Sequence, residues 1–209
     1  MKRPLITLLL ATGFLAARPA ESQVFGQYTG AEVVPVNGHL FGGYVHASNG
    51  FLGLLAQLRL SFYSDVDFGF QGGLTRISLP GGDVTSLRVG TDLKAHVAHS
   101  SSGDLAIGGA LGIETGDHLH ILTIGPTAVV SRTFGAASGA GITPYAGVGF
   151  LFSNIEIGDR QTTDFSLPFR AGAEFRLAPE VRICAELQLR ASDEVNDDFG
   201  FVTGVNLPF

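Results

Sequence analysis

The sequence predicts an all-β protein that folds as an antiparallel up-and-down transmembrane β-barrel of about ten strands, with eight as the alternative. Apolar and polar residues alternate along many segments, which is the period of a strand and not of a helix. Gly accounts for 29 of 209 residues, roughly twice its average usage, as expected of a chain with many turns and close strand contacts. Beyond the N-terminus, the apolar runs are too short for transmembrane helices, so a membrane form would have to cross with strands.

The N-terminus is typical of a secretory signal peptide. Lys2 and Arg3 form a basic start, and an apolar core extends over residues 5–17. At roughly a dozen residues, this core is too short to span a bilayer as a helix. We therefore expect residues 1–22 to direct export through the Sec pathway and to be removed, with cleavage after Ala17 or Ser22.

The segment 23–36 follows the signal peptide and has no clear periodicity. It fits either an additional strand or a periplasmic lead-in to a barrel over residues 37–209. Because single-chain bacterial barrels use even numbers of strands, the lead-in is favoured.

Charge and cysteine content exclude several functions. Removal of residues 1–22 leaves 10 basic and 18 acidic residues, a net charge of −8. Nucleic acid is therefore not an expected partner, because binding to phosphates requires a basic surface. Cys184 is the only cysteine, which rules out an intrachain disulfide and a thiolate metal cluster.

Ten segments are predicted as strands. Five alternate cleanly: 51–62, 66–75, 87–97, 167–176 and 181–190. Five are less regular: 38–47, 105–115, 119–133, 142–154 and 198–209. Most have about ten to twelve residues, near the length that a tilted strand needs to cross a bilayer.

Turn sequences separate these segments. They include Ser48-Asn49-Gly50, Pro80-Gly81-Gly82-Asp83, Ser102-Gly103-Asp104 and Ala178-Pro179-Glu180. Polar outer loops are expected over residues 155–164 and 192–198, and a longer inner turn over residues 133–142.

One face of the predicted strands is apolar and the other carries charges of both signs. If the apolar face contacts lipid, the charged face lines the lumen. That inward set comprises Arg59, Arg88, Lys94, Arg170, Arg176, Arg182, Arg190, Asp67, Asp92, Glu114, Glu174 and Glu186. Because buried charges must pair or be hydrated, we expect an ion-pair network that fills the lumen.

Aromatic residues are predicted to form two girdles at the ends of the barrel. With the C-terminus on the periplasmic side, the inner girdle comprises Phe62, Tyr63, Phe134, Phe175 and Phe209. The outer girdle comprises Phe51, Phe152, Phe165 and Phe199.

The last residues favour a membrane barrel over a soluble barrel such as a lipocalin, which also alternates but turns its apolar face inward. Phe209 is preceded at alternate positions by Leu207, Val205 and Thr203. A terminal aromatic on an amphipathic strand resembles the signal that the barrel assembly machinery reads in outer-membrane proteins.

The chain resembles the small outer-membrane β-barrel family that includes opacity-type proteins and OmpA-like barrel domains. The resembling segments are 124–127, 143–150, 170–175 and the terminal Phe209. The resemblance implies fold and location in the cell outer membrane of a Gram-negative-type bacterium, with lipid and lipopolysaccharide as surroundings. Members serve as adhesins, lipid-modifying enzymes, narrow pores or anchors, so the fold does not select among these roles.

His46-Ala47-Ser48-Asn49 is the main enzymatic candidate. It resembles the His-x-Ser-Asn motif of lipid A deacylases, in which His46 would deprotonate Ser48 and a carboxylate would orient the imidazole. No Glu follows on the next strand, the motif lies in the first hairpin instead of late in the chain, and Ser-Asn-Gly is also an ordinary hairpin turn.

Two acidic or histidine-containing groups are candidate metal sites. Glu114, Asp117, His118 and His120 surround one turn, and the two histidines alternate onto one face. Asp193, Glu194, Asp197 and Asp198 could bind Ca²⁺, but their spacing lacks the Gly and the terminal Glu of a calcium loop. We therefore assign no catalytic, cofactor-binding or metal residue from sequence.

The sequence thus predicts a non-enzymatic outer-membrane barrel with a structural or surface-interaction role and an unidentified extracellular ligand as a possible partner. A lipid A hydrolase using His46 and Ser48, and a narrow pore for small solutes, are the alternatives.

Overall fold

The computed structural model describes residues 27–79, 82–135, 140–192 and 198–209. The predicted signal peptide therefore lies outside the described residues. The first six strands are β1 (His39–Ser48), β2 (Phe51–Tyr63), β3 (Val66–Leu79), β4 (Gly82–Ser100), β5 (Gly103–Gly116) and β6 (Leu119–Ser131). The others are β7 (Phe134–Gly135), β8 (Gly141–Gly149), β9 (Leu151–Ile157), β10 (Arg160–Ala178), β11 (Val181–Ser192) and β12 (Asp198–Pro208). No helix in the described ranges is long and apolar enough to cross a membrane.

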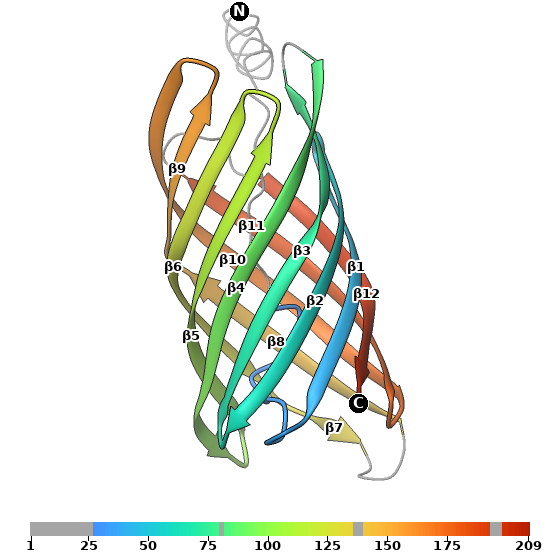
Figure 1. Cartoon of the computed structure of the whole chain (residues 1–209). Helices are drawn as coiled ribbons and strands as arrows, with labels where there is room; N and C mark the ends of the chain where they lie inside the picture. The colour runs from blue at the N-terminus through green and yellow to red at the C-terminus, as the bar shows by residue number, and fades with distance from the viewer. Residues whose placement is uncertain (1–26, 80–81, 136–139, 193–197) are drawn as a thin grey trace, which may run out of the picture.

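The strands form one closed antiparallel barrel (Figure 1). Each of β1 to β6 pairs with its neighbour in sequence, and β12 pairs with β1 from Pro208 opposite Leu40 to Gly200 opposite Ser48. In the described part of the chain, β8 and β9 together form one barrel strand between β6 and β10, which gives ten positions around the barrel. The predicted all-β fold with ten strands is confirmed.

The interruption between β8 and β9 has a local cause. Pairing with β6 keeps the same register on both sides of Phe150, with Gly149 opposite Thr127 and Phe152 opposite Ile124. The residue facing Phe150 is Pro126, which has no N–H to donate, so only the bond from Phe150 N–H to the Pro126 carbonyl forms, at 3.0 Å. The segment predicted as a single strand over 142–154 is therefore one strand with a broken ladder.

The connections that the structure describes in full are short at both ends of the barrel. Asn49 and Gly50 connect β1 to β2, and Ser64 and Asp65 connect β2 to β3. The outer loop predicted for residues 155–164 is wrong: β9 and β10 continue to pair up to Ile157 opposite Arg160. Only Gly158 and Asp159 remain for the turn, and Gly158 has a φ of 58°, which suits Gly. The central part of the loop predicted over 192–198 lies outside the described residues.

Side chains alternate between the lumen and the outer surface as predicted. The exposed apolar side chains on β11 include Ile183, Leu187 and Leu189, while Glu186, Gln188 and Arg190 are buried. The same division holds on β2, β3, β4, β10 and β12. The barrel therefore has an apolar outer surface and a polar interior, which is the reverse of a soluble barrel.

Phe51 departs from the predicted outer girdle. It points into the lumen, where its ring lies 5.3 Å from Cζ of Arg88 and 4.7 Å from the His46 ring. It belongs to an inward-facing apolar cluster with Ile77, Leu119, Ile121 and Ile155. Each of these residues follows the alternation of its own strand. Phe51 was assigned to the girdle because it lies near a strand end, but that position does not determine which face its side chain occupies.

Candidate functional site

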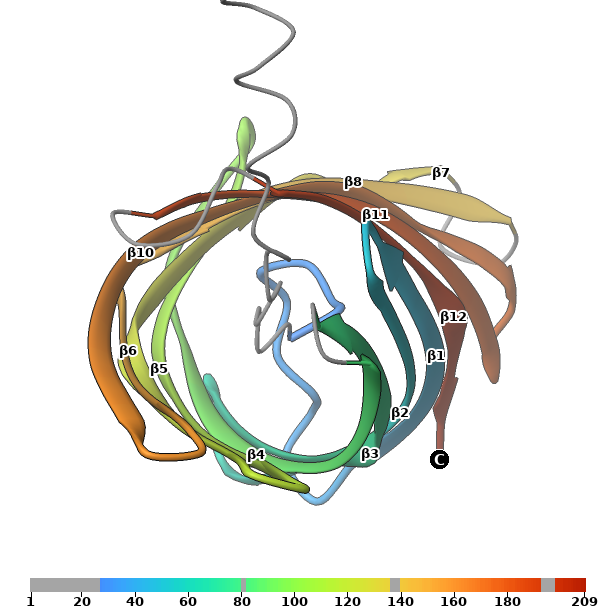
Figure 2. The ribbon, with the colours of Figure 1, turned by 90° about the horizontal axis from the view of Figure 1, so that it is seen from above.

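The described part of the segment 23–36 lies inside the barrel. Figure 2 shows this stretch within the ring of strands. Gln27, Tyr28, Thr29, Ala31 and Val34 are buried. The described residues of the segment form no strand, so they add no member to the barrel wall and occupy the lumen instead. We refer to residues 27–36 as the plug.

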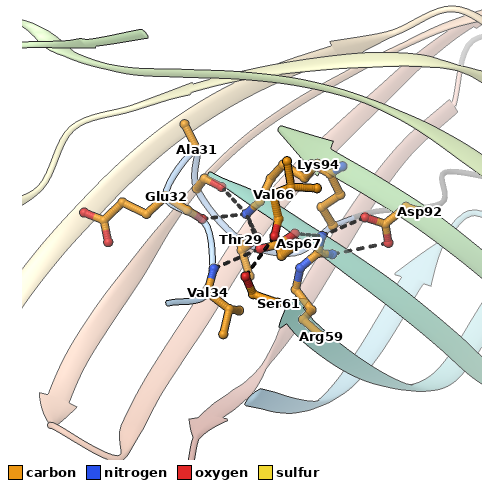
Figure 3. Close-up of polar contacts among 12 residues, drawn as sticks. Thr29, Ala31, Glu32, Val34, Arg59, Ser61, Val66, Asp67, Asp92 and Lys94 are labelled. Atoms are coloured by element: carbon orange, nitrogen blue, oxygen red, sulfur yellow. Dashed lines mark hydrogen bonds and ion pairs between the residues drawn. The ribbon is translucent and has the colours of Figure 1, made fainter. Parts of the chain in front are cut away.

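Lys94 of β4 is the principal contact of the plug (Figure 3). Its Nζ donates hydrogen bonds to Oγ1 of Thr29 at 3.1 Å and to the carbonyl oxygens of Gly30 at 3.0 Å and Glu32 at 2.6 Å. A bend in the plug thus presents successive oxygens to one ammonium group, which has three protons to donate. Because hydrogen bonds from a charged donor are stronger than neutral ones, Lys94 is a main anchor of the segment.

The same wall contains a buried charge cluster that holds Lys94 in place. Arg59 of β2 bonds to Asp67 of β3 and to Oδ1 of Asp92 of β4, the latter at 2.8 Å. Asp67 also lies 3.7 Å from Nζ of Lys94 and accepts a bond from the Val34 backbone N–H at 3.0 Å. Two carboxylates therefore face two cations, and this balance keeps the charges stable without bulk water.

Side chains of β6, β10 and β12 also contact the backbone of the plug, as acceptors and as a donor. Glu174 of β10 accepts the backbone N–H of Gly30 at 2.9 Å, and Ser131 of β6 accepts that of Ala31 at 2.8 Å. Asn206 of β12 donates to the carbonyl of Tyr28 at 3.3 Å. The plug thus uses its backbone groups to bridge strands from across the barrel, which satisfies polar groups that would otherwise be buried without partners.

Further ion pairs line the rest of the lumen. Arg88 of β4 bonds to Glu114 of β5 at 2.8 Å, and Arg190 of β11 bonds to Asp164 of β10. Looser pairs join Arg170 to Glu186 at 3.5 Å and Arg182 to Glu174 at 3.8 Å. Of the predicted inward charges, all but Arg176 thus have an ion-pair partner on another strand within the described part of the chain. Asp164 was missed because it was assigned to an outer loop, and the lengthened β10 places it in the lumen.

A cavity of about 370 Å³ lies between the plug and the end of the barrel that carries the C-terminus. Its charged lining comprises Glu32, Arg59, Asp67, Lys94, Glu174 and Arg182. The rim includes His39 of β1 and Phe209, and the plug residues Thr29 and Gly30 line it as well. The cavity is a vestibule in contact with the plug, lined by both charged and apolar side chains.

His46 and Ser48 both lie on the lumen side of β1, but they do not form a catalytic arrangement. Neither ring nitrogen of His46 nor Oγ of Ser48 has a hydrogen-bond partner among the described residues. His46 packs against Phe51 instead. A hydrolytic triad requires bonds from nucleophile to base and from base to carboxylate, and this geometry lacks both.

The first candidate metal group is divided between the two faces of the barrel. Glu114 points into the lumen, where it bonds to Arg88. His118 and His120 are exposed on the outside, and Nδ1 of His120 lies 2.9 Å from Oγ1 of Thr115. One ion cannot reach both faces. Of the acidic group at 193–198, residues 193–197 lie outside the described residues.

The inward position of the charged side chains could be anticipated from alternation, but the plug could not. Its residues carry no period and no charge pattern that matches the wall. The only available signal was the Gln27-Tyr28-Thr29-Gly30 stretch, whose polar side chains and Gly suit a bend, and such stretches are common in loops.

No protein-family model matches the sequence, and no curated protein matches it. Among solved structures, the chain is similar to a bacterial polysaccharide outer membrane secretin, with a TM-score of 0.50 and 12% identity over 82% of this chain and 69% of that chain. It is also similar to the N-terminal barrel of OprF from Pseudomonas aeruginosa, with a TM-score of 0.44 and 13% identity over 83% and 98% of the two chains. An outer membrane channel from Pseudomonas putida F1 gives a TM-score of 0.49 and 13% identity, over 90% of this chain and 100% of the channel. Together with the closed ten-stranded barrel, the first of these likenesses defines the fold as that of an outer-membrane β-barrel.

Proposed function

We propose that this chain is a non-enzymatic integral outer-membrane protein with an occluded lumen, and that it has a structural or surface-interaction role. The observation that carries the proposal is the plug, which Lys94, Glu174 and Ser131 hold inside the barrel from different strands. A lumen that is filled with paired charges and backbone is suited to a stable anchor and not to bulk transport.

The outer surface supports membrane insertion. Exposed apolar side chains continue around the barrel, for example Leu54 on β2, Val89 on β4 and Ile124 on β6. Phe62, Tyr63 and Phe209 are exposed near one end, and Phe152 and Phe199 near the other. An apolar band between aromatic residues matches the lipid-facing surface of such barrels.

Location and partners follow from the same proposal. The chain would be exported through the Sec pathway and inserted in the cell outer membrane of a Gram-negative-type bacterium, with lipid and lipopolysaccharide around it. The barrel assembly machinery would read the last strand, which ends in Phe209. Membership of the opacity-type or OmpA-like barrel family is part of this proposal.

A lipid A hydrolase is the enzymatic alternative. His46 and Ser48 would need a carboxylate partner and a path for lipid into the lumen. Their isolation from hydrogen-bond partners speaks against this role, and replacement of His46 by Ala tests it. If cells with the His46→Ala variant differ in lipid A composition from cells with the wild type, the hydrolase function is favoured over the non-enzymatic one.

Planar-bilayer recording tests the occluded lumen. The wild type should conduct ions poorly or not at all, because the plug and the ion pairs fill the interior. A variant with Glu174→Ala and Glu186→Ala removes two carboxylates that pair with Arg182 and Arg170, and it should show openings. Large, stable openings in the wild type would overturn the proposal in favour of a pore.

A further inference from the structure

A cluster of metal-ligating side chains lies apart from the plug, at the end of the barrel that carries the C-terminus. His96 and His99 of β4 face Asp104 of β5. Nδ1 of His99 lies 2.6 Å from Oδ1 of Asp104, and Nε2 of His96 lies 3.1 Å from the same oxygen. The ligand atoms of all three residues lie within 4.8 Å of one another.

A β-bulge creates this cluster. In a regular strand, residues three positions apart point to opposite faces, so His96 and His99 would be separated by the sheet. The pairing of β4 with β5 shifts between His96 and Ala98, and beyond the shift His99 pairs directly with Asp104. The extra residue therefore turns both imidazoles toward one carboxylate. Bulges that re-aim side chains are frequent next to functional sites.

Asp65 lies on the far side of the His96 ring. Its Oδ1 is 3.9 Å from Nδ1 of His96, and its carbonyl oxygen accepts the His96 backbone N–H at 2.8 Å. In metal sites, a ligating imidazole usually donates its other N–H to a carboxylate or to water, which fixes the ring and leaves the remaining nitrogen for the metal. At 3.9 Å the Asp65 carboxylate is beyond direct hydrogen-bond distance of Nδ1, so it can reach that N–H only through a small movement or a water, while Nε2 faces Asp104 at 3.1 Å.

Accessibility also suits a binding site. The side chain of His99 is 77% exposed, whereas those of His96 and Asp104 are 18% and 12% exposed. Two ligand groups are therefore held by the barrel wall, and the third can adjust. Tetrahedral coordination at bond lengths of about 2.0–2.2 Å places ligand atoms about 3.3 Å apart, so small movements of His99 are sufficient.

We propose that His96, His99 and Asp104 bind one divalent transition-metal ion of the Zn²⁺ type, with water completing the coordination. Two imidazoles and one carboxylate form a ligand set that suits Zn²⁺, Ni²⁺ or Cu²⁺ and not Ca²⁺ or Mg²⁺. The ion fastens β4 to β5 beside the bulge. Through His96 and Asp65 it also stiffens the turn between β2 and β3.

Calorimetric titration of the tag-free, detergent-folded barrel with ZnCl₂ tests the site. The wild type should bind one Zn²⁺ per chain, and His99→Ala and Asp104→Asn should each abolish saturable binding. Asp65→Asn should weaken the affinity by about 10- to 100-fold, as expected for a residue that positions a ligand. With Co²⁺ as the probe, the wild type should develop the visible absorption of tetrahedral Co²⁺, and His99→Ala should not.

The matched control is a variant with His118→Ala and His120→Ala, because these exposed histidines lie beside the β5–β6 turn, at the other end of β5 from Asp104. It should bind Zn²⁺ as the wild type does. Heat-modifiable gel mobility confirms that each variant is folded, and the exposed His99 can be replaced with little loss of packing. The proposal is overturned if the wild type shows no saturable 1:1 binding, if folded His99→Ala binds normally, or if the control variant loses binding.

Discussion

Nζ of Lys94 lies 2.6 Å from the carbonyl oxygen of Glu32, a residue 62 positions earlier in the chain. This contact joins the barrel wall to the plug. Backbone pairing holds every strand of the barrel, whereas the plug depends on single bonds from a few side chains, including Glu174 and Ser131. A single substitution should therefore displace the plug more readily than it unfolds the barrel.

Replacement of Lys94 by Met should release the plug. Met keeps the length of the side chain but donates no hydrogen bonds, and each bond from a charged donor contributes about 1.5–3 kcal/mol. We expect ion-channel openings in planar bilayers from Lys94→Met and larger ones after deletion of residues 23–33. Arg76→Met is the control, because Arg76 pairs with Asp83 on an exposed hairpin. A deletion variant as closed as the wild type would show that the plug does not occlude the lumen.

Gly69→Ala should destabilise the barrel, because Gly69 makes room for the Arg59–Asp92 ion pair. A Cβ at this position would collide with Oδ2 of Asp92 and approach Nη1 of Arg59 to 2.7 Å. Forcing extra atoms into a packed interior costs about 1–3 kcal/mol. Gly43→Ala is a matched control, since a Cβ there meets nothing within 4 Å. Urea unfolding in lipid vesicles gives the free energy of unfolding of both variants. Equal values for Gly69→Ala and Gly43→Ala would contradict the prediction.

Leu187→Arg should impair folding much more than Gln188→Arg. Leu187 is 47% exposed on the outer surface, whereas Gln188 is 1% exposed in a lumen that already holds Arg190. A cation near mid-depth on the lipid face costs about 2–4 kcal/mol. Folding yield into vesicles, followed by gel mobility without boiling, compares the two variants. The opposite order would mean that the apolar face does not contact lipid.

Deletion of Phe209 should reduce assembly in the outer membrane without affecting export. Phe209 and His39 exchange backbone hydrogen bonds at 3.0 and 3.1 Å, and their rings stack at 5.2 Å. The deletion therefore weakens the closing contact between β1 and the end of the chain as well as the expected targeting signal. Phe175→Ala, another exposed aromatic near the same end, is the control. Unchanged amounts of detergent-resistant barrel after the deletion would refute the prediction.

Much of the fold could be predicted because the relevant information is local. Alternation along residues 181–190 was sufficient to place Leu187 outside and Arg190 inside, since successive side chains of a strand point to opposite faces. Strand ends were less predictable. Polar residues over 155–164 indicated a loop, yet β9 and β10 pair through them, because a hairpin that projects beyond the apolar belt can carry polar side chains.

The partners of the lumen residues could not be predicted, because they depend on which strands meet and in what register. Alternation placed Arg190 in the lumen but could not identify Asp164 as its partner. His96 and His99 showed no sign of acting together, since only the bulge in β4 brings them to Asp104. The predicted metal group at 114–120 was divided for the same reason: the register of β5 with β6 sets Glu114 opposite the inward-facing Ile121, so His120 points outward.

By itself, the sequence determined an antiparallel barrel, about ten strands and the direction in which most of their side chains point, because the period of two is a property of the extended backbone. Only the tertiary structure decided where residues 27–36 lie. Their position in the lumen results from donors and acceptors on β4, β6, β10 and β12, which are far apart in the sequence. These groups converge only when the barrel closes, and closure is a property of the whole chain and not of any segment.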